Sequence, residues 1–300
     1  MKKLIRVILV SMLLSLFCGM TAMAAPAEGT IVALGEDLSP EQRATVLNLM
    51  GLTEADLASC TVITITNEQE HQYLDAYVDP AVIGTRALSS VMVTPAESGH
   101  GVMVSTKNIN YCTTGMYRNA LLTAGVQDAD ILVVGPTELS GTAALIGAIK
   151  AYEEMSGENI SDATLDTAMN ELVATGEIAT HSASSEQVEE LIAYIKGKLA
   201  AGELDNEEEI RAAIAEGEEK FGVDLTDAEV QQIVDFMMKI KDLGLDPNML
   251  LDQAADLYAQ YGDELLQKAQ DPGFWGNVGN FFVSAGNAIA DFFKELFGWE

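Results

Sequence analysis

The chain has few basic side chains for its length. Its 300 residues include 16 lysines and arginines against 46 aspartates and glutamates, which gives a formal net charge of −30 at pH 7. Such a surface repels phosphate backbones, so we expect no nucleic-acid partner. The acidic excess is greatest after residue 150. Weak binding of divalent cations is one interpretation of that region, and a solvated acidic face is the simpler one.

The sequence also lacks the motifs that hold metals and cofactors. It contains no HExxH, CxxC or EF-hand pattern, and its three histidines, His71, His100 and His181, are scattered. Ser98 lies close to His100, but the flanking residues do not form the GxSxG turn of serine hydrolases. Cys112 could meet a histidine in the folded chain, although no spacing indicates it. We therefore assign no catalytic residue, no metal site and no cofactor.

Cysteine is scarce, with 3 in the whole chain. Cys18 lies in the N-terminal apolar segment, which leaves Cys60 and Cys112 in the remainder. An exported protein can form disulfides, and both residues fall at the ends of predicted strands or helices. A bridge requires Cα atoms within about 7 Å, so a disulfide between them and two separate buried thiols are both compatible with the sequence.

The apolar run at 7–17 is shorter than the roughly 20 residues that span a bilayer. It follows a basic start that includes Lys2 and Arg6, and it precedes small residues that end at Ala24. This arrangement is typical of a secretory signal peptide, so we predict that residues 1–24 are cleaved off after Ala24. An uncleaved anchor helix is the alternative. We expect the mature protein outside the cell or at the cell envelope.

Between residues 25 and 156, strand patterns alternate with helix patterns. Five β-branched or apolar segments predict strands at 30–35, 61–66, 87–94, 101–109 and 129–134. Capping residues and helical spacing predict helices at 39–50, 67–74, 113–124 and 140–154. A turn-rich stretch separates the third strand from the fourth, so we expect those two to pair as a β-hairpin. The prediction is an α+β or α/β fold, with an N-terminal mixed β-sheet domain covered by helices.

After residue 156 the strand pattern disappears. Candidate helices begin near residues 161, 184, 204, 226, 247 and 274. Capping boxes support two of these starts, Ser184 with Gln187 and Thr226 with Glu229. We predict an all-α domain over residues 157–272.

Both tryptophans lie in the last predicted helix, 273–300. Large apolar residues recur there at steps of three and four and include Trp275, Phe282, Ile289, Phe292 and Trp299. The opposite side of this helix is polar, so we do not expect it to span a membrane. Three fates remain open for the apolar stripe: docking on the helical domain, self-association or partner binding, and contact with a membrane surface. The segment has one basic residue, which disfavours the membrane surface.

One strand-to-helix junction fits a ligand site. The stretch 135–142 follows a strand and leads into a helix, whose start presents free N–H groups and the positive end of the helix dipole. Ser140, Gly141 and Thr142 are therefore candidate ligand-binding residues, although Ser140 also fits an N-cap. Arg86 is a further candidate, because an arginine here fits either a buried tether to a carboxylate or a group that recognises an anionic ligand.

Three longer strings resemble a known family. They are Thr64–Leu74, Ile83–Ser90 and Ser140–Leu145. These strings are similar to the DUF1002 family of secreted proteins of Gram-positive bacteria, and the resemblance covers most of the chain after the signal peptide. The family has no known function, so the resemblance implies export and an aromatic-rich C-terminal helix but no catalytic residues.

These features together predict a secreted, non-catalytic binding or interaction protein that acts at the cell envelope or in the medium. Its partner would be an envelope component or a second copy bound through the C-terminal helix. The alternatives are an extracellular hydrolase acting on wall or peptide material, and a peripheral membrane protein held by the same helix. A pocket that gathers Arg86, Ser140 and a histidine would favour the hydrolase.

Overall fold

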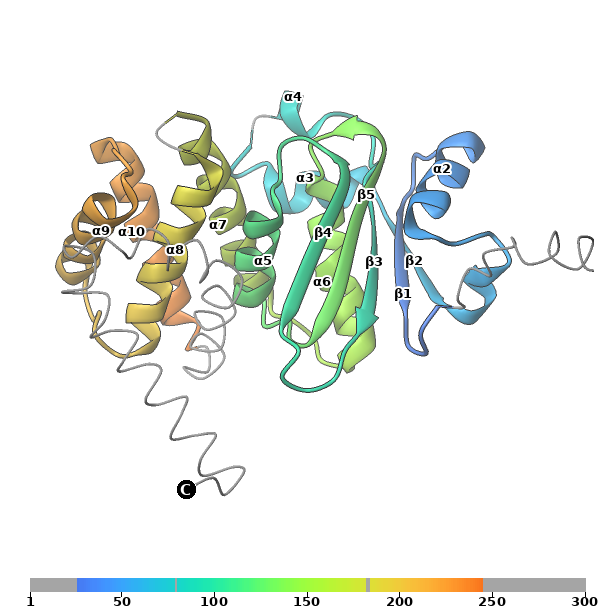
Figure 1. The fold of residues 1–300 in the computed structure, drawn as a ribbon. Helices are drawn as coiled ribbons and strands as arrows, with labels where there is room; N and C mark the ends of the chain where they lie inside the picture. The colour runs from blue at the N-terminus through green and yellow to red at the C-terminus, as the bar shows by residue number, and fades with distance from the viewer. Residues whose placement is uncertain (1–25, 79, 182–183, 245–300) are drawn as a thin grey trace, which may run out of the picture.

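A computed structural model describes residues 26–78, 80–181 and 184–244, and it has an α+β fold built on one five-stranded mixed sheet (Figure 1). The strands are β1 (Ile31–Gly35), β2 (Thr61–Ile65), β3 (Ser90–Pro95), β4 (Val102–Ile109) and β5 (Ala129–Leu139). The helices beside the sheet are α2 (Pro40–Met50), η1 (Asp56–Ser59), α3 (Asn67–Leu74), α4 (Pro80–Ile83), α5 (Thr114–Thr123) and α6 (Thr142–Ser156). The later helices are α7 (Asp162–His181), α8 (Ser185–Ala200), α9 (Glu207–Phe221) and α10 (Asp227–Asp242).

Four of the five strands run in the same direction. The order across the sheet is β2-β1-β3-β5-β4. β1 is parallel to β2 and β4 is parallel to β5, while β3 is antiparallel to both of its neighbours, β1 and β5. The carboxyl ends of β1, β2, β4 and β5 therefore meet at one edge of the sheet, and β3 begins at that edge.

The predicted β-hairpin is wrong. β3 and β4 form as predicted, but β5 lies between them, with Val133 opposite Val91 on one side and Ile131 opposite Val104 on the other. Ile131, Val133 and Val134 of β5 are buried, and a strand buried on both faces is most stable with a hydrogen-bonded neighbour on each side. The turn-rich connection between β3 and β4 therefore crosses the end of β5 instead of closing a tight turn.

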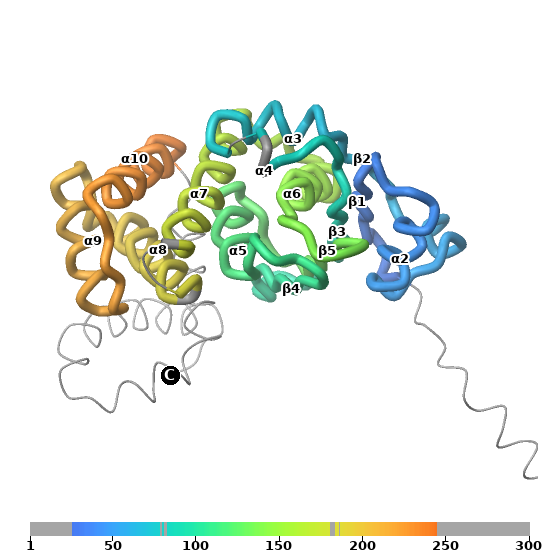
Figure 2. Tube along the Cα trace, turned by 90° about the horizontal axis from the view of Figure 1, so that it is seen from above, coloured from blue at the N-terminus to red at the C-terminus, as the bar shows by residue number. Residues whose placement is uncertain are grey.

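Helices cover the two faces of the sheet unequally (Figure 2). α2 packs on one face, where Val32 and Leu34 meet Val46 and Leu47, and α6 packs on the other, over β1, β2 and β3. The alternating residues of β1 point to these two cores, as the period of two of a strand requires. α6 approaches closely because residue 147 is glycine, where a Cβ would stand 3.0 Å from a methyl group of Val91.

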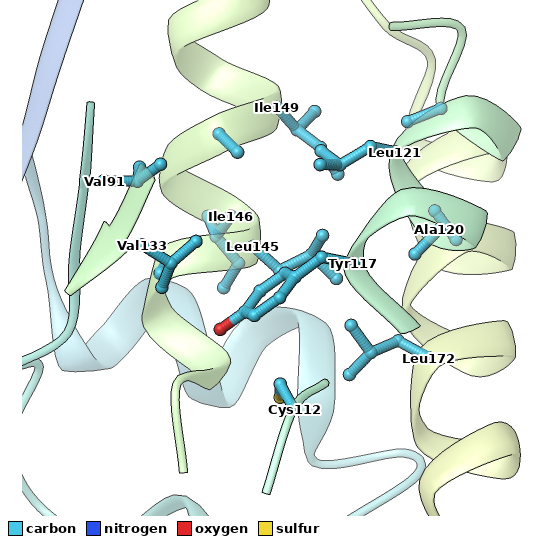
Figure 3. Packing of buried hydrophobic residues seen from close by; sticks show 14 of the residues in the cluster. Val91, Cys112, Tyr117, Ala120, Leu121, Val133, Leu145, Ile146, Ile149 and Leu172 are labelled. Atoms are coloured by element: carbon cyan, nitrogen blue, oxygen red, sulfur yellow. The ribbon is translucent and has the colours of Figure 1, made fainter. Parts of the chain in front are cut away.

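The core between α5 and α6 is built around Tyr117. Figure 3 shows its ring reaching from α5 past Leu145 and Ile146 of α6, with Cys112 close by. The phenol is fully buried, and its hydroxyl donates a hydrogen bond of 2.6 Å to the carbonyl of Gly141. This bond ties α5 to the start of α6.

Helix α7 belongs to two cores. Its first half, up to Val173, packs with the sheet, and its second half, from Ala174, packs with α8, α9 and α10. The described residues after 156 form only helices and their connections. The predicted domain boundary between residues 156 and 157 stays a prediction. None of the described helices is both long enough and apolar enough to cross a membrane.

A buried ion pair joins the sheet region to the helices. Lys196 on α8 and Glu171 on α7 lie 2.9 Å apart with side chains 2% and 0% exposed. The ammonium also donates to the carbonyl of Asn119 at 2.9 Å and to the hydroxyl of Thr123 at 2.7 Å, both on α5. Burial lowers the pKa of Lys196 and raises that of Glu171, while the pair's mutual attraction opposes both shifts. No sequence pattern pointed to this pair.

Candidate ligand-binding site

The described residues contain a pocket at the edge where the parallel strands end. Its lining comes from segments that follow β2, β4 and β5 and from the segment that precedes β3. Ligands of α/β proteins commonly bind at this edge, because the loops there are free to vary above a rigid sheet. The volume is about 490 Å³, within the usual range for small-molecule sites. The lining residues are Glu70, Ile83, Gly84, Thr85, Arg86, Leu88, Ser89, Asn110, Leu139, Ser140 and Thr142.

Glu70 lies at the floor of this pocket. The sequence Thr66-x-x-Gln69 forms a capping box at the start of α3, and the helix then turns Glu70 inward, where it is only 2% exposed. Its carboxylate accepts hydrogen bonds from the hydroxyl of Thr142 at 3.0 Å and from the side-chain amide of Asn67 at 3.2 Å. Burial raises the pKa of Glu70, and these two hydrogen bonds lower it by less.

The start of α6 forms a second wall. Gly141 is the N-cap, with φ of 95°, a conformation that glycine adopts readily and other residues rarely do. A Cβ at this position would also stand 2.3 Å from the hydroxyl oxygen of Tyr117. The backbone N–H of Ala144, in the first turn, donates to the hydroxyl of Ser89 at 2.9 Å. The junction between β5 and α6 therefore depends on glycine at position 141, and the side chain of Ser89 holds the first turn of α6.

The third wall is the segment 83–89, which is held at two points. The carbonyl of Gly84 accepts from the side chain of Asn67 at 3.4 Å and lies 3.0 Å from Nε2 of His71. The backbone N–H of Ala87 donates to the carboxylate of Asp37 at 2.8 Å. The other ring nitrogen of His71 lies 2.7 Å from Asp75, and this hydrogen bond raises the pKa of the histidine.

Three of the four predicted ligand-binding residues line the pocket: Arg86, Ser140 and Thr142. Gly141 lies between two of them as the N-cap of α6, so the expectation that Ser140 is the N-cap is wrong. Gly141 makes no side-chain capping bond, and the hydroxyl of Ser89 accepts from the N–H of Ala144 in the place of a capping side chain. Arg86 is exposed, so the buried-tether interpretation is also wrong.

The two cysteines do not form a disulfide. Cys60 and Cys112 are both free, and they belong to cores on opposite faces of the sheet. Cys112 is fully buried, which raises the pKa of its thiol to about 12 and keeps it protonated at neutral pH. The sheet itself separates the two sulfur atoms, a relationship that sequence spacing does not reveal.

Other polar residues considered in the sequence lie away from the pocket. His100 makes a 3.0 Å contact with Asp130 and does not line the pocket, and neither does Ser98. The described residues contain no group of three or more His, Cys, Asp or Glu side chains able to hold a metal ion. The predicted interaction helix, with Trp275, Phe282, Ile289, Phe292 and Trp299, lies outside the described residues.

Sequence reasoning missed Glu70, Ser89 and Asn110. Each lies just beyond the end of a strand or just before β3, at the shared edge. The rule that parallel strands place their carboxyl ends together would have grouped Glu70 and Asn110 with Ser140.

Comparison with known proteins gives a family match. A family model described as "Protein of unknown function (DUF1002)" matches residues 34–257. The chain is also 38% identical over 299 residues to "Uncharacterized protein YpuA" of Bacillus subtilis (strain 168), with 98% of this chain and 100% of the relative covered. No solved structure matches the chain.

Proposed function

Because the chain belongs to the DUF1002 family, whose description assigns no function, we propose from its own geometry that it is a secreted, non-catalytic binding protein. Its ligand binds in the pocket at the carboxyl edge of the parallel strands. The signal-peptide pattern of residues 1–24 supports export, and the acidic composition suits a soluble protein acting at the envelope or in the medium.

One observation carries the binding proposal: two hydroxyl groups of the pocket, those of Thr142 and Ser89, are engaged in hydrogen bonds that position the pocket walls. The hydroxyl of Thr142 donates to Glu70, and the hydroxyl of Ser89 accepts from the backbone of α6. A nucleophile instead needs a base aligned to remove its proton, as in a serine–histidine pair. His71 lies behind the wall, against Gly84, and is not among the lining residues. This arrangement favours recognition over hydrolysis.

A third part of the proposal concerns the remainder of the chain. The described helices after residue 156 form a separate all-α domain that supports the sheet domain. The buried pair of Lys196 and Glu171 supports a fixed attachment of these helices to the sheet domain, because such a pair is stable only when both partners stay enclosed.

A thermal-shift screen tests the binding function. The mature protein is heated with small polar metabolites and with fractions of digested cell wall, and a ligand raises Tm by mass action. Thr85 is exposed on the rim, so Thr85→Trp fills the mouth of the pocket without breaking a buried contact. Gln127→Trp, at the exposed opposite end of β5, is the matched control. A ligand-induced rise in Tm that is present in Gln127→Trp and absent in Thr85→Trp supports the proposal. Shifts that persist in Thr85→Trp contradict it.

A further inference from the structure

Glu70 is a buried carboxylate whose hydrogen-bond donors are neutral. Among the described residues, the hydroxyl of Thr142 and the amide of Asn67 donate to it, and none of the ion pairs there includes it. Each carboxylate oxygen therefore retains a free acceptor position. The charge of His71 also lowers the pKa of Glu70, but by less than these two hydrogen bonds. A buried carboxylate at the floor of an open pocket is best complemented by a cation, since pairing compensates the desolvation of the charge.

Arg86 brings the opposite charge to the same pocket. It lies between α4 and β3, and its side chain is exposed at the rim. The planar guanidinium binds carboxylates in a bidentate geometry that a lysine cannot provide. The pocket thus has a negative group at its floor and a positive group at its mouth.

The start of α6 does not compete with Arg86 for an anion. Helix N-termini attract anions, but the carboxylate of Glu70 already stands beside the first residue of α6 through its bond with Thr142. A ligand anion placed there would face like charge from Glu70. The side chains of Ser89, Asn110 and Ser140 supply neutral donors and acceptors between the two charged ends.

From this arrangement we infer that the ligand is an amino acid or a short peptide with free ends, whose ammonium group binds Glu70 and whose carboxylate binds Arg86. The inference rests on the proposed binding function and gives it a ligand class. The acidic protein surface assists by attracting the ammonium end. The volume of about 490 Å³ leaves room for more than one residue.

Titration calorimetry with blocked peptides tests the two ends separately. The probes are alanine, alanyl-alanine, N-acetyl-alanyl-alanine and alanyl-alanine amide, added to the mature protein at pH 7. We expect alanyl-alanine to bind the wild type at least about tenfold more tightly than either blocked form, since a hydrogen bond to a charged group contributes about 1.5–3 kcal/mol. In Glu70→Gln the preference for the free ammonium is lost, and in Arg86→Gln the preference for the free carboxylate is lost.

Two controls keep the result interpretable. Glu68→Gln removes an exposed carboxylate from the same helix, and Arg43→Gln removes a half-buried cation, paired with Glu54, from α2 on the other face of the sheet. Both should bind as the wild type does. Far-ultraviolet circular dichroism establishes that each variant is folded.

The inference is overturned if the wild type binds the blocked peptides as well as alanyl-alanine, or if Glu70→Gln keeps the full preference for the ammonium. It is also overturned if no probe binds while the thermal-shift screen finds a pocket ligand without an amine. That last outcome contradicts only the ligand class and leaves the binding function intact. A screen that finds no pocket-dependent ligand contradicts both the binding function and the ligand class.

Discussion

Replacing Lys196 with methionine should destabilise the protein strongly. The substitution keeps most of the side-chain volume but removes the ammonium that faces Glu171, Thr123 and the carbonyl of Asn119. Glu171 is 0% exposed, so its carboxylate cannot reach water when its partner is lost. Removing one partner of a buried ion pair typically costs 3–5 kcal/mol, and we expect a loss of about that size in the free energy of unfolding.

The loss should depend on pH in a defined direction. Burial already raises the pKa of Glu171, and removing the attraction of Lys196 raises it further. A folded carboxyl group with a raised pKa binds more protons than the unfolded one, so stability falls as pH rises through that range. Lys196→Met should therefore lose less stability at pH 4 than at pH 7. Replacing Glu171 with methionine as well removes the unpaired charge and should restore much of the loss.

Urea unfolding followed by circular dichroism measures these differences. Lys241→Met is the matched control, because Lys241 forms an exposed pair with Asp205 at 3.3 Å. Exposed pairs contribute roughly 0–1 kcal/mol, so this variant should resemble the wild type. A loss below about 1 kcal/mol for Lys196→Met, or one that is the same at pH 4 and pH 7, would refute the reasoning from burial.

Three further predictions concern the pocket and the core. Glu70→Gln should be more stable than the wild type at pH 7, because burial raises the pKa of Glu70 and wild-type stability falls as pH rises through that pKa. Urea titrations below the usual carboxyl pKa should show a smaller difference in stability between the two proteins. Gly141→Ala should lower the free energy of unfolding by about 1–3 kcal/mol in the same assay, because of the positive φ and the clash with the hydroxyl of Tyr117. An unchanged urea midpoint of unfolding would contradict the cap geometry. The mature chain, denatured without reductant, should give two reactive thiols, Cys60 and Cys112, in a colorimetric thiol assay, and none if they were bridged.

The local predictions from sequence succeeded where short-range chemistry decides the structure. The predicted boxes of Ser184 with Gln187 and Thr226 with Glu229 both form, because each depends on residues three apart. Small errors occurred where two residues compete for one role. The helix predicted over 67–74 has Thr66 as its N-cap, and α9 begins at residue 207, later than the predicted start near residue 204.

Long-range relationships were harder to predict. β5 was expected to end at Val134, but it continues to Leu139, with a register shift in β4 between Lys107 and Ile109. Gly135 and the following proline suggested a loop, but β5 continues through them and pairs again with β4 at Leu139, opposite Ile109. The insertion of β5 between β3 and β4 is likewise decided by burial of the whole sheet, which no local pattern encodes. The candidate site shows the same division: the sequence pointed to the residues before α6 but not to Glu70 at the floor of the pocket.

Native mass spectrometry tests the central claim most directly. The mature chain is produced in Bacillus subtilis, purified from the medium without denaturation, and compared with Thr85→Trp and Gln127→Trp purified in the same way. The account predicts one small molecule retained by the wild type and by Gln127→Trp and absent from Thr85→Trp. Equal retention by all three proteins would place the ligand outside the pocket and contradict the account.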